Sequence, residues 1–208
     1  MPFGENMRTQ PETIRDVLEI VGPALRLQFR AYQEARKSWS GGITVYQSAT
    51  APGGPGDDDD RSPFQEQNDY IQAMKRLEWL KPIVATSAAA LLSSADSLVA
   101  EWEKRCGIRD KYLTRDKAGP EVGRAHLGGV LRVSVNNARH YMGDDWKLRK
   151  PGSDADKNIT VLESAGLRGP WDQMIGDRAL QRLEFEEFDA FAAALSATLH
   201  DLERSKKT

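Results

Sequence analysis

The sequence predicts an all-α protein, a bundle of about four to six helices. Apolar residues recur at helical spacing through several long segments of the 208-residue chain. No segment alternates apolar and polar residues in the manner of a half-buried strand. Hydrophobic residues make up 39% of the chain, enough for the core of one domain. We therefore expect a single helical domain over residues 1–208.

Composition and charge exclude several classes of protein. The formal net charge is -2, so the chain lacks the global basic excess of a general nucleic-acid binder. The single cysteine, Cys106, excludes a disulfide framework within the chain. The first residues lack the apolar core of a signal peptide, and no run reaches the roughly 18 uninterrupted apolar residues of a membrane span. We expect a cytoplasmic protein that does not bind a membrane.

The first helix is predicted to begin at Thr9 or Thr13 and to end near Trp39. Its apolar residues keep helical spacing, but Pro23 lacks a backbone donor and predicts a kink or a break. Residues 40–63 are rich in Gly, Pro and Ser and contain four consecutive aspartates. Such a composition resists regular structure, so we expect an exposed, flexible loop there.

A second helical region is expected from Phe64 to the glycine at position 107, with a break or a new helix start at Pro82. Small residues such as Ala88 and Ala89 would let another helix approach this region closely.

Three further helices are expected in the second half of the chain. The first starts at Pro120 and carries the polar stretch "VNNARHYMGDDW", residues 135–146. A loop over 147–158 precedes a brief helix that ends at Gly166. The last helix runs almost to the C-terminus, with phenylalanines and leucines at helical spacing.

A polar stripe lies along the helix that carries this stretch. Residues three and four apart are neighbours on a helix, so Arg132, Asn136 and His140 share one face. Arg139 lies beside Asn136 in this arrangement, and Asp144 follows His140 by one turn. The opposite face is apolar, so the polar groups are gathered together instead of scattered.

Such a stripe suits chemistry on RNA. Arg132 would clamp phosphate oxygens, and Asn136 would orient the substrate. His140 would move the proton during attack by the 2′-hydroxyl of the RNA itself. Arg139 and Asp144 would contact the substrate. The sequence has no repeated Glu-x-x-His pair of the ferritin-like kind, so neither a metal nor another cofactor is expected.

A structural interpretation of the same residues stays open. Ion pairs and hydrogen bonds that tie one helix to its neighbours produce similar clusters. In that case Arg139 pairs with Asp144 or Asp145, Asn136 caps the helix or bridges to a neighbour, and His140 makes one hydrogen bond in the core.

The stretches "NNARHYMGDDWK" and "NITVLESAGL" resemble a pattern of the HEPN-like helical superfamily of bacteria. The resemblance covers residues 132–167. Members of this superfamily include RNases of toxin–antitoxin and phage-defence systems and also non-catalytic relatives. The resemblance implies a toxin-type or defence factor that cleaves or binds RNA, without a metal, as a homodimer with both motifs at a shared cleft.

The chain departs from the catalytic signature of this superfamily at one position. Asn136 and His140 match the signature, but Val135 stands where an arginine belongs. Either Arg132, one helical turn earlier, replaces that arginine, or the activity is lost. The second hypothesis is therefore a non-catalytic helical interaction module, such as an antitoxin or a complex subunit, that binds a partner protein.

Overall fold

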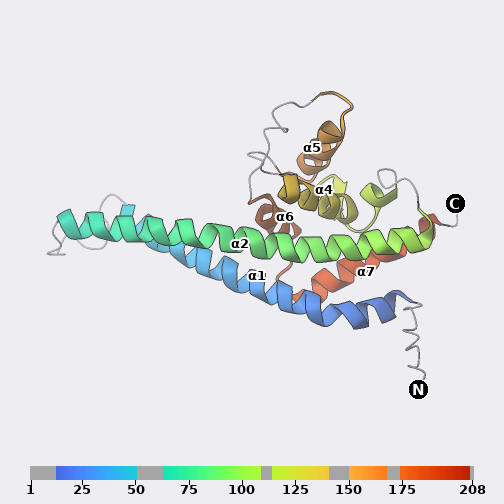
Figure 1. Cartoon of the computed structure of the whole chain (residues 1–208), viewed down its shortest axis with the longest axis horizontal. Coiled ribbons are helices and arrows are strands. Elements are labelled where there is room, and N and C mark those ends of the chain that lie inside the picture. The colour runs from blue at the N-terminus through green and yellow to red at the C-terminus, as the bar shows by residue number, and fades with distance from the viewer. Residues whose placement is uncertain (1–12, 51–62, 109–113, 141–149, 168–173, 207–208) are drawn as a thin grey trace, which may run out of the picture.

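A computed structural model of the chain describes residues 13–50, 63–108, 114–140, 150–167 and 174–206. Within these ranges the protein is an all-α bundle of six α-helices, with one 3-10 turn and two strands of two residues each (Figure 1). The fold class predicted from the sequence is confirmed.

Two long helices form a hairpin that runs through the whole molecule. Helix α1 spans Ile14–Thr50 and helix α2 spans Pro63–Cys106. The two helices run in opposite directions and diverge toward the N-terminus of α1, where α7 (Phe188–Ser205) contacts both of them (Figure 1). The other end of the hairpin extends beyond the remaining helices.

Helix α1 corrects two predictions from the sequence. Of the kink or break predicted at Pro23, the break does not occur: the helix continues through Pro23, which lies on the exposed side, where water can solvate the carbonyl group that loses its donor. The preceding Gly22 has no Cβ to clash with the proline ring.

The loop predicted for residues 40–63 is also partly wrong, since α1 continues to Thr50. Close packing explains this extension: a Cβ on Gly42 would lie 3.0 Å from Leu77 of α2. The Tyr46 and Tyr70 rings meet 5.6 Å apart between the same helices. The remaining part of the predicted loop, 51–62, lies outside the described residues.

The break predicted at Pro82 is likewise wrong, because α2 is one helix of 44 residues. Pro82 is exposed, so the missing backbone hydrogen bond falls on the solvent side of α2. The predicted close approach at Ala88 and Ala89 is confirmed. A Cβ on Gly176 of helix α6 (Ile175–Leu183) would lie 3.5 Å from the Ala88 Cβ.

The next elements along the chain lie on one side of α2 (Figure 1). The 3-10 turn η1 (Arg115–Lys117) leads to strands β1 (Glu121–Val122) and β2 (Ala125–His126), which pair antiparallel. Helices α4 (Leu127–His140) and α5 (Asp154–Ser164) follow.

Two helix starts in this half differ from the predictions, and one helix was not predicted. The paired strands β1 and β2 precede α4, so this helix starts at Leu127 and not at Pro120. The side chain of Ser153 caps α5 by accepting a hydrogen bond from the backbone N–H of Asp156, so α5 begins inside the predicted loop. Helix α6 was not predicted, because its nine residues offer too short an apolar pattern.

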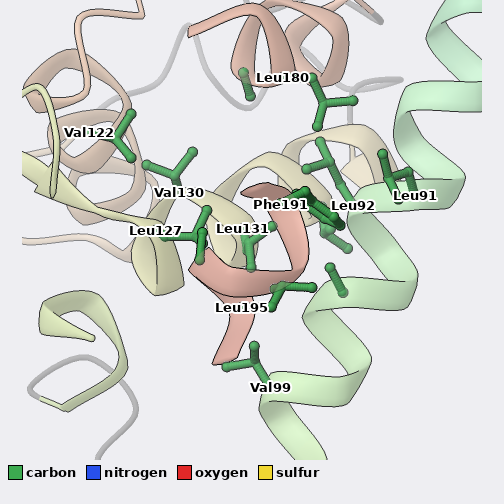
Figure 2. Close-up of a cluster of buried hydrophobic side chains, with 14 of the residues drawn as sticks. Leu91, Leu92, Val99, Val122, Leu127, Val130, Leu131, Leu180, Phe191 and Leu195 are labelled. Carbon is green, nitrogen blue, oxygen red and sulfur yellow. The ribbon is translucent and has the colours of Figure 1, made fainter. Parts of the chain in front are cut away.

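The core lies where α4 and α7 meet α2. Phe191 and Leu195 of α7 pack beside Leu131 of α4 and Leu92 of α2 (Figure 2). These side chains are all at most 1% exposed. The apolar stripe predicted for the last helix is therefore the centre of the fold.

The central position of α2 also explains its composition. Within residues 67–106, a window of 18 residues has a mean hydropathy of 1.5, which by length and composition alone would suit a membrane span. In this fold, 39% of that window is buried, and α2 contacts α1, α4, α6 and α7. A core helix meets the same criterion, so the hydropathy of α2 is weak evidence for a span.

Candidate functional site

Two glycines at the start of α4 bring η1 against this helix. A Cβ on Gly128 would lie 2.4 Å from the backbone oxygen of Arg115, and one on Gly129 would lie 3.2 Å from the Asp116 Cα. The backbone N–H of Gly128 donates to the carbonyl of Ala118 at 3.0 Å. Because neither glycine has a side chain, η1 can lie close enough to α4 for Asp116 to contact the polar side chains of this helix.

Arg132 is held in a buried polar cluster. Its Nε donates to Oδ1 of Asp116 at 2.9 Å and its Nη2 to Oδ2 at 2.6 Å, which makes the ion pair bidentate. Its Nη1 donates to Oδ1 of Asn158 at 2.8 Å. Arg132 is 8% exposed. The guanidinium group therefore links α4 to η1 and α5.

A second buried arginine extends the cluster to α2. Arg115 pairs with Asp96 and also donates from Nη1 to Oε2 of Glu103 at 3.3 Å. Burial raises the pKa of the Glu103 carboxyl above its ordinary value, and the Arg115 guanidinium offsets part of this shift. The charges of Arg115 and Asp116 in η1 are thus neutralised by α2 on one side and α4 on the other.

The other predicted site residues lie beyond Arg132 on α4 or after it. Asn136 is half-buried. Arg139 and His140 belong to the last turn of α4, but their side chains lie outside the described part of the structure. Asp144 also lies outside the described residues. The structure therefore confirms the helical spacing of Arg132, Asn136 and His140, and shows contacts of the Arg132 side chain only with groups of the fold.

A buried polar cluster between α1 and α6 was missed by the sequence analysis. The hydroxyl of Tyr32 donates to Oδ1 of Asp177 at 2.8 Å, and Arg36 lies 3.2 Å from the same oxygen. Gln181 donates to Oδ2 at 2.6 Å. Burial raises the pKa of Asp177, while these partners oppose the shift. No sequence pattern joins positions 145 residues apart, so this cluster could not have been predicted.

Exposed apolar side chains gather on the hairpin. Trp79 of α2 is 76% exposed, and Ile83, one turn later, is 52% exposed. Two further side chains, Ile71 and Met74, are exposed toward the free end of α2. Trp79 and Ile83, one helical turn apart on one side of α2, form the surface that we call the hairpin patch. The Trp–x–x–x–Ile spacing beside charged residues could have indicated this patch from the sequence.

Metal-binding geometry is absent from the part of the chain that the structure describes, where no three His, Cys, Asp or Glu side chains converge on one point.

Comparisons with known proteins identify no relative: no family model matches the chain, and no curated protein or solved structure is significantly similar to it.

Proposed function

We propose that this chain is a non-catalytic helical interaction module, and that its partner is a second copy of the same chain bound through the hairpin patch. The observation that carries this proposal is the 76% exposure of Trp79 on helix α2. A large aromatic side chain left in water loses the free energy that burial would give it, and Trp is enriched at the centres of protein interfaces.

The charges around the patch suit a second copy as the partner. Lys75, Arg76 and Glu78 are exposed beside Trp79, so the patch carries both signs of charge around an apolar centre. In a two-fold dimer the same surface meets itself. Trp79 and Ile83 of one chain can then face those of the other, while Arg76 lies opposite a carboxylate.

The contacts of Arg132 support a non-catalytic role for the polar stripe. Because Arg132 is 8% exposed and three of its five N–H groups already donate to Asp116 and Asn158, turning the guanidinium toward a phosphate would break these hydrogen bonds. Removing one partner of a buried ion pair costs about 3–5 kcal/mol. A structural role for Arg132 involves no such cost.

Sedimentation velocity over a range of protein concentrations tests the proposed dimer. We expect the wild-type chain to sediment as a dimer and Trp79→Glu to sediment as a folded monomer, because the change buries a charge in the interface. Trp79→Phe is the matched control and should stay dimeric. A wild-type protein that remains monomeric up to about 100 μM would contradict the proposal, because this corresponds to a binding free energy weaker than roughly −5.5 kcal/mol.

RNA cleavage remains a second candidate function, favoured by one observation. Helix α4 extends to His140, so Asn136 and His140 lie one turn apart as the superfamily signature requires. If the protein cleaves RNA, His140→Ala should lower the rate about a hundredfold or more while the protein stays folded. Intact RNA after incubation with the wild-type protein would exclude this function for the RNAs tested.

A further inference from the structure

Two adjoining cavities lie where the hairpin helices diverge. The first, between α1 and α2, has a volume of about 730 Å³, and the second, between α2 and α7, has a volume of about 910 Å³. Trp102 and Arg105 of α2 line both cavities. Cavities of roughly 300–1,000 Å³ are typical of small-molecule sites.

The walls of the first cavity are mainly apolar. Val17 and Val21 of α1 face Leu98 of α2 across it, and the Trp102 ring lies toward one end. On the α2 side, Ser94 and Ser97 have small side chains and therefore leave space in the cavity. Such a space suits a flexible hydrocarbon chain, whose transfer from water contributes about 0.8 kcal/mol for each buried CH₂ group.

A cation without an ion-pair partner among the described residues lies at the Trp102 end of this cavity. Glu101 is paired with Lys104 at 3.0 Å, so its charge is compensated. Arg105 makes no ion pair with any described residue, and its guanidinium carbon lies 5.1 Å above the Trp102 ring. Lys206 adds a further cation to the lining of the second cavity, where Glu203 lies near His200 at 3.6 Å.

A buried donor without an acceptor lies at the same place. Trp102 is 4% exposed, and its indole N–H has no hydrogen-bond partner in the structure. Buried donors are nearly always paired, so an orphaned one calls for an explanation. Arg105 covers the ring, and movement of its guanidinium toward an anion would open the indole N–H to the same anion.

We propose that these cavities form a binding site for an anionic amphiphile of the fatty-acid class. Its hydrocarbon chain would lie between α1 and α2, and its carboxylate would pair with Arg105 and accept from the indole N–H of Trp102. The site lies on other residues than the hairpin patch, so this proposal is independent of the proposed dimer.

Calorimetric titration of the full chain with decanoate, below its micelle concentration, tests the charged part of the site. Decanoate should bind at least tenfold more tightly than decanol, which has the same chain without the charge. Arg105→Gln should weaken decanoate binding about tenfold and leave decanol binding unchanged. Arg30→Gln removes the same charge from an exposed position outside both cavities and should change neither. Equal binding of decanoate by the wild type and Arg105→Gln would overturn the proposal, as would the absence of decanoate binding.

Two variants test the position of the hydrocarbon chain. Ala24 and Ser97 are exposed residues on opposite walls of the first cavity, so a larger side chain should fill the space without unfolding the protein. Ala24→Trp and Ser97→Trp should each abolish the binding of decanoate and decanol. Full binding by both folded variants would overturn the proposal. The proposal would also be overturned if these variants converted a dimer to a monomer while decanoate binding stayed unchanged. In that case a second copy of the chain would occupy the cavity.

Discussion

Arg132 connects three segments of the chain through one side chain. Its planar guanidinium donates in two directions to Asp116 and in a third to Asn158. A lysine has the same charge but cannot reproduce this fork. The contribution of this residue to the fold therefore depends on geometry as well as charge.

Arg132→Lys should lower the free energy of unfolding by roughly 2–4 kcal/mol, because Asp116 and Asn158 lose buried partners. Urea denaturation measures the change. Arg30→Lys, at an exposed position on α1, is the matched control and should shift stability by less than about 0.5 kcal/mol. If the two variants are equally stable, the Arg132 cluster does not hold the fold together.

Glu103 should give the protein a distinctive dependence on pH. Its pKa is raised in the folded state, so the folded protein binds this proton more tightly than the unfolded chain. Its contribution to stability is therefore greatest at low pH and falls as the pH rises from the ordinary carboxyl range through the raised pKa. Glu103→Gln cannot titrate and removes this dependence.

Urea denaturation of the wild type and Glu103→Gln from about pH 4 to pH 7 measures the effect. We expect the stability of the wild type relative to the variant to fall as the pH rises. A relative stability that rises or stays constant over this range would contradict the raised pKa.

Sequence analysis could identify the polar residues of α4 but not their partners. Helical spacing correctly placed Arg132 and Asn136 on one helix, because that relation is local. The partner Asp116 is contributed by a three-residue 3-10 turn, and Asn158 by a helix 26 residues later. Asn137, the residue after Asn136, is fully buried. Its position in the helical pattern did not predict this burial.

At the scale of elements, backbone proximity determines where glycine is required. Gly128 lies against the backbone of η1, where a Cβ would meet the Arg115 oxygen at 2.4 Å. A Cβ on Gly41 of α1, in contrast, would have no neighbouring atom within 4 Å. Both residues are helical, so they form a matched pair.

Gly128→Ala should destabilise the protein by about 1–3 kcal/mol, because η1 must move away from α4. Gly41→Ala should stabilise it by about 0.5–1 kcal/mol, because alanine favours the helix and meets no obstacle. Thermal unfolding of both variants measures the two changes in stability, which should have opposite signs. A stabilised Gly128→Ala protein would show that η1 does not pack tightly on α4.

The lengths of α1 and α2 were underestimated for a related reason. Gly41, Gly42 and Pro82 are poor helix formers, and local propensity alone favours a break at each. Pairing of the two helices outweighs this cost, since Gly42 lets Leu77 approach closely and Tyr46 meets Tyr70. The apolar periodicity of α7, in contrast, was sufficient to predict its helix, because a local pattern and the core coincide there.

At the scale of the whole molecule, the fold separates two surfaces. The polar side of α4 is tied to η1 and α5, whereas the hairpin extends beyond these elements with its apolar patch exposed (Figure 1). The first surface contributes to stability, and the second is available to a partner. Helical spacing in the sequence indicates which residues share each surface, but which surface is covered and which is exposed depends on the folded protein.

Site-specific crosslinking tests most directly whether the hairpin patch joins two copies. In a Cys106→Ser background, Ile83→Cys places one exposed thiol in the patch, and Glu186→Cys places one at an exposed position outside the patch. With a short thiol crosslinker, Ile83→Cys should form a covalent dimer at micromolar protein concentration, and Glu186→Cys should not. A covalent dimer from Glu186→Cys, with Ile83→Cys remaining monomeric, would contradict the assignment of the interface to the hairpin patch.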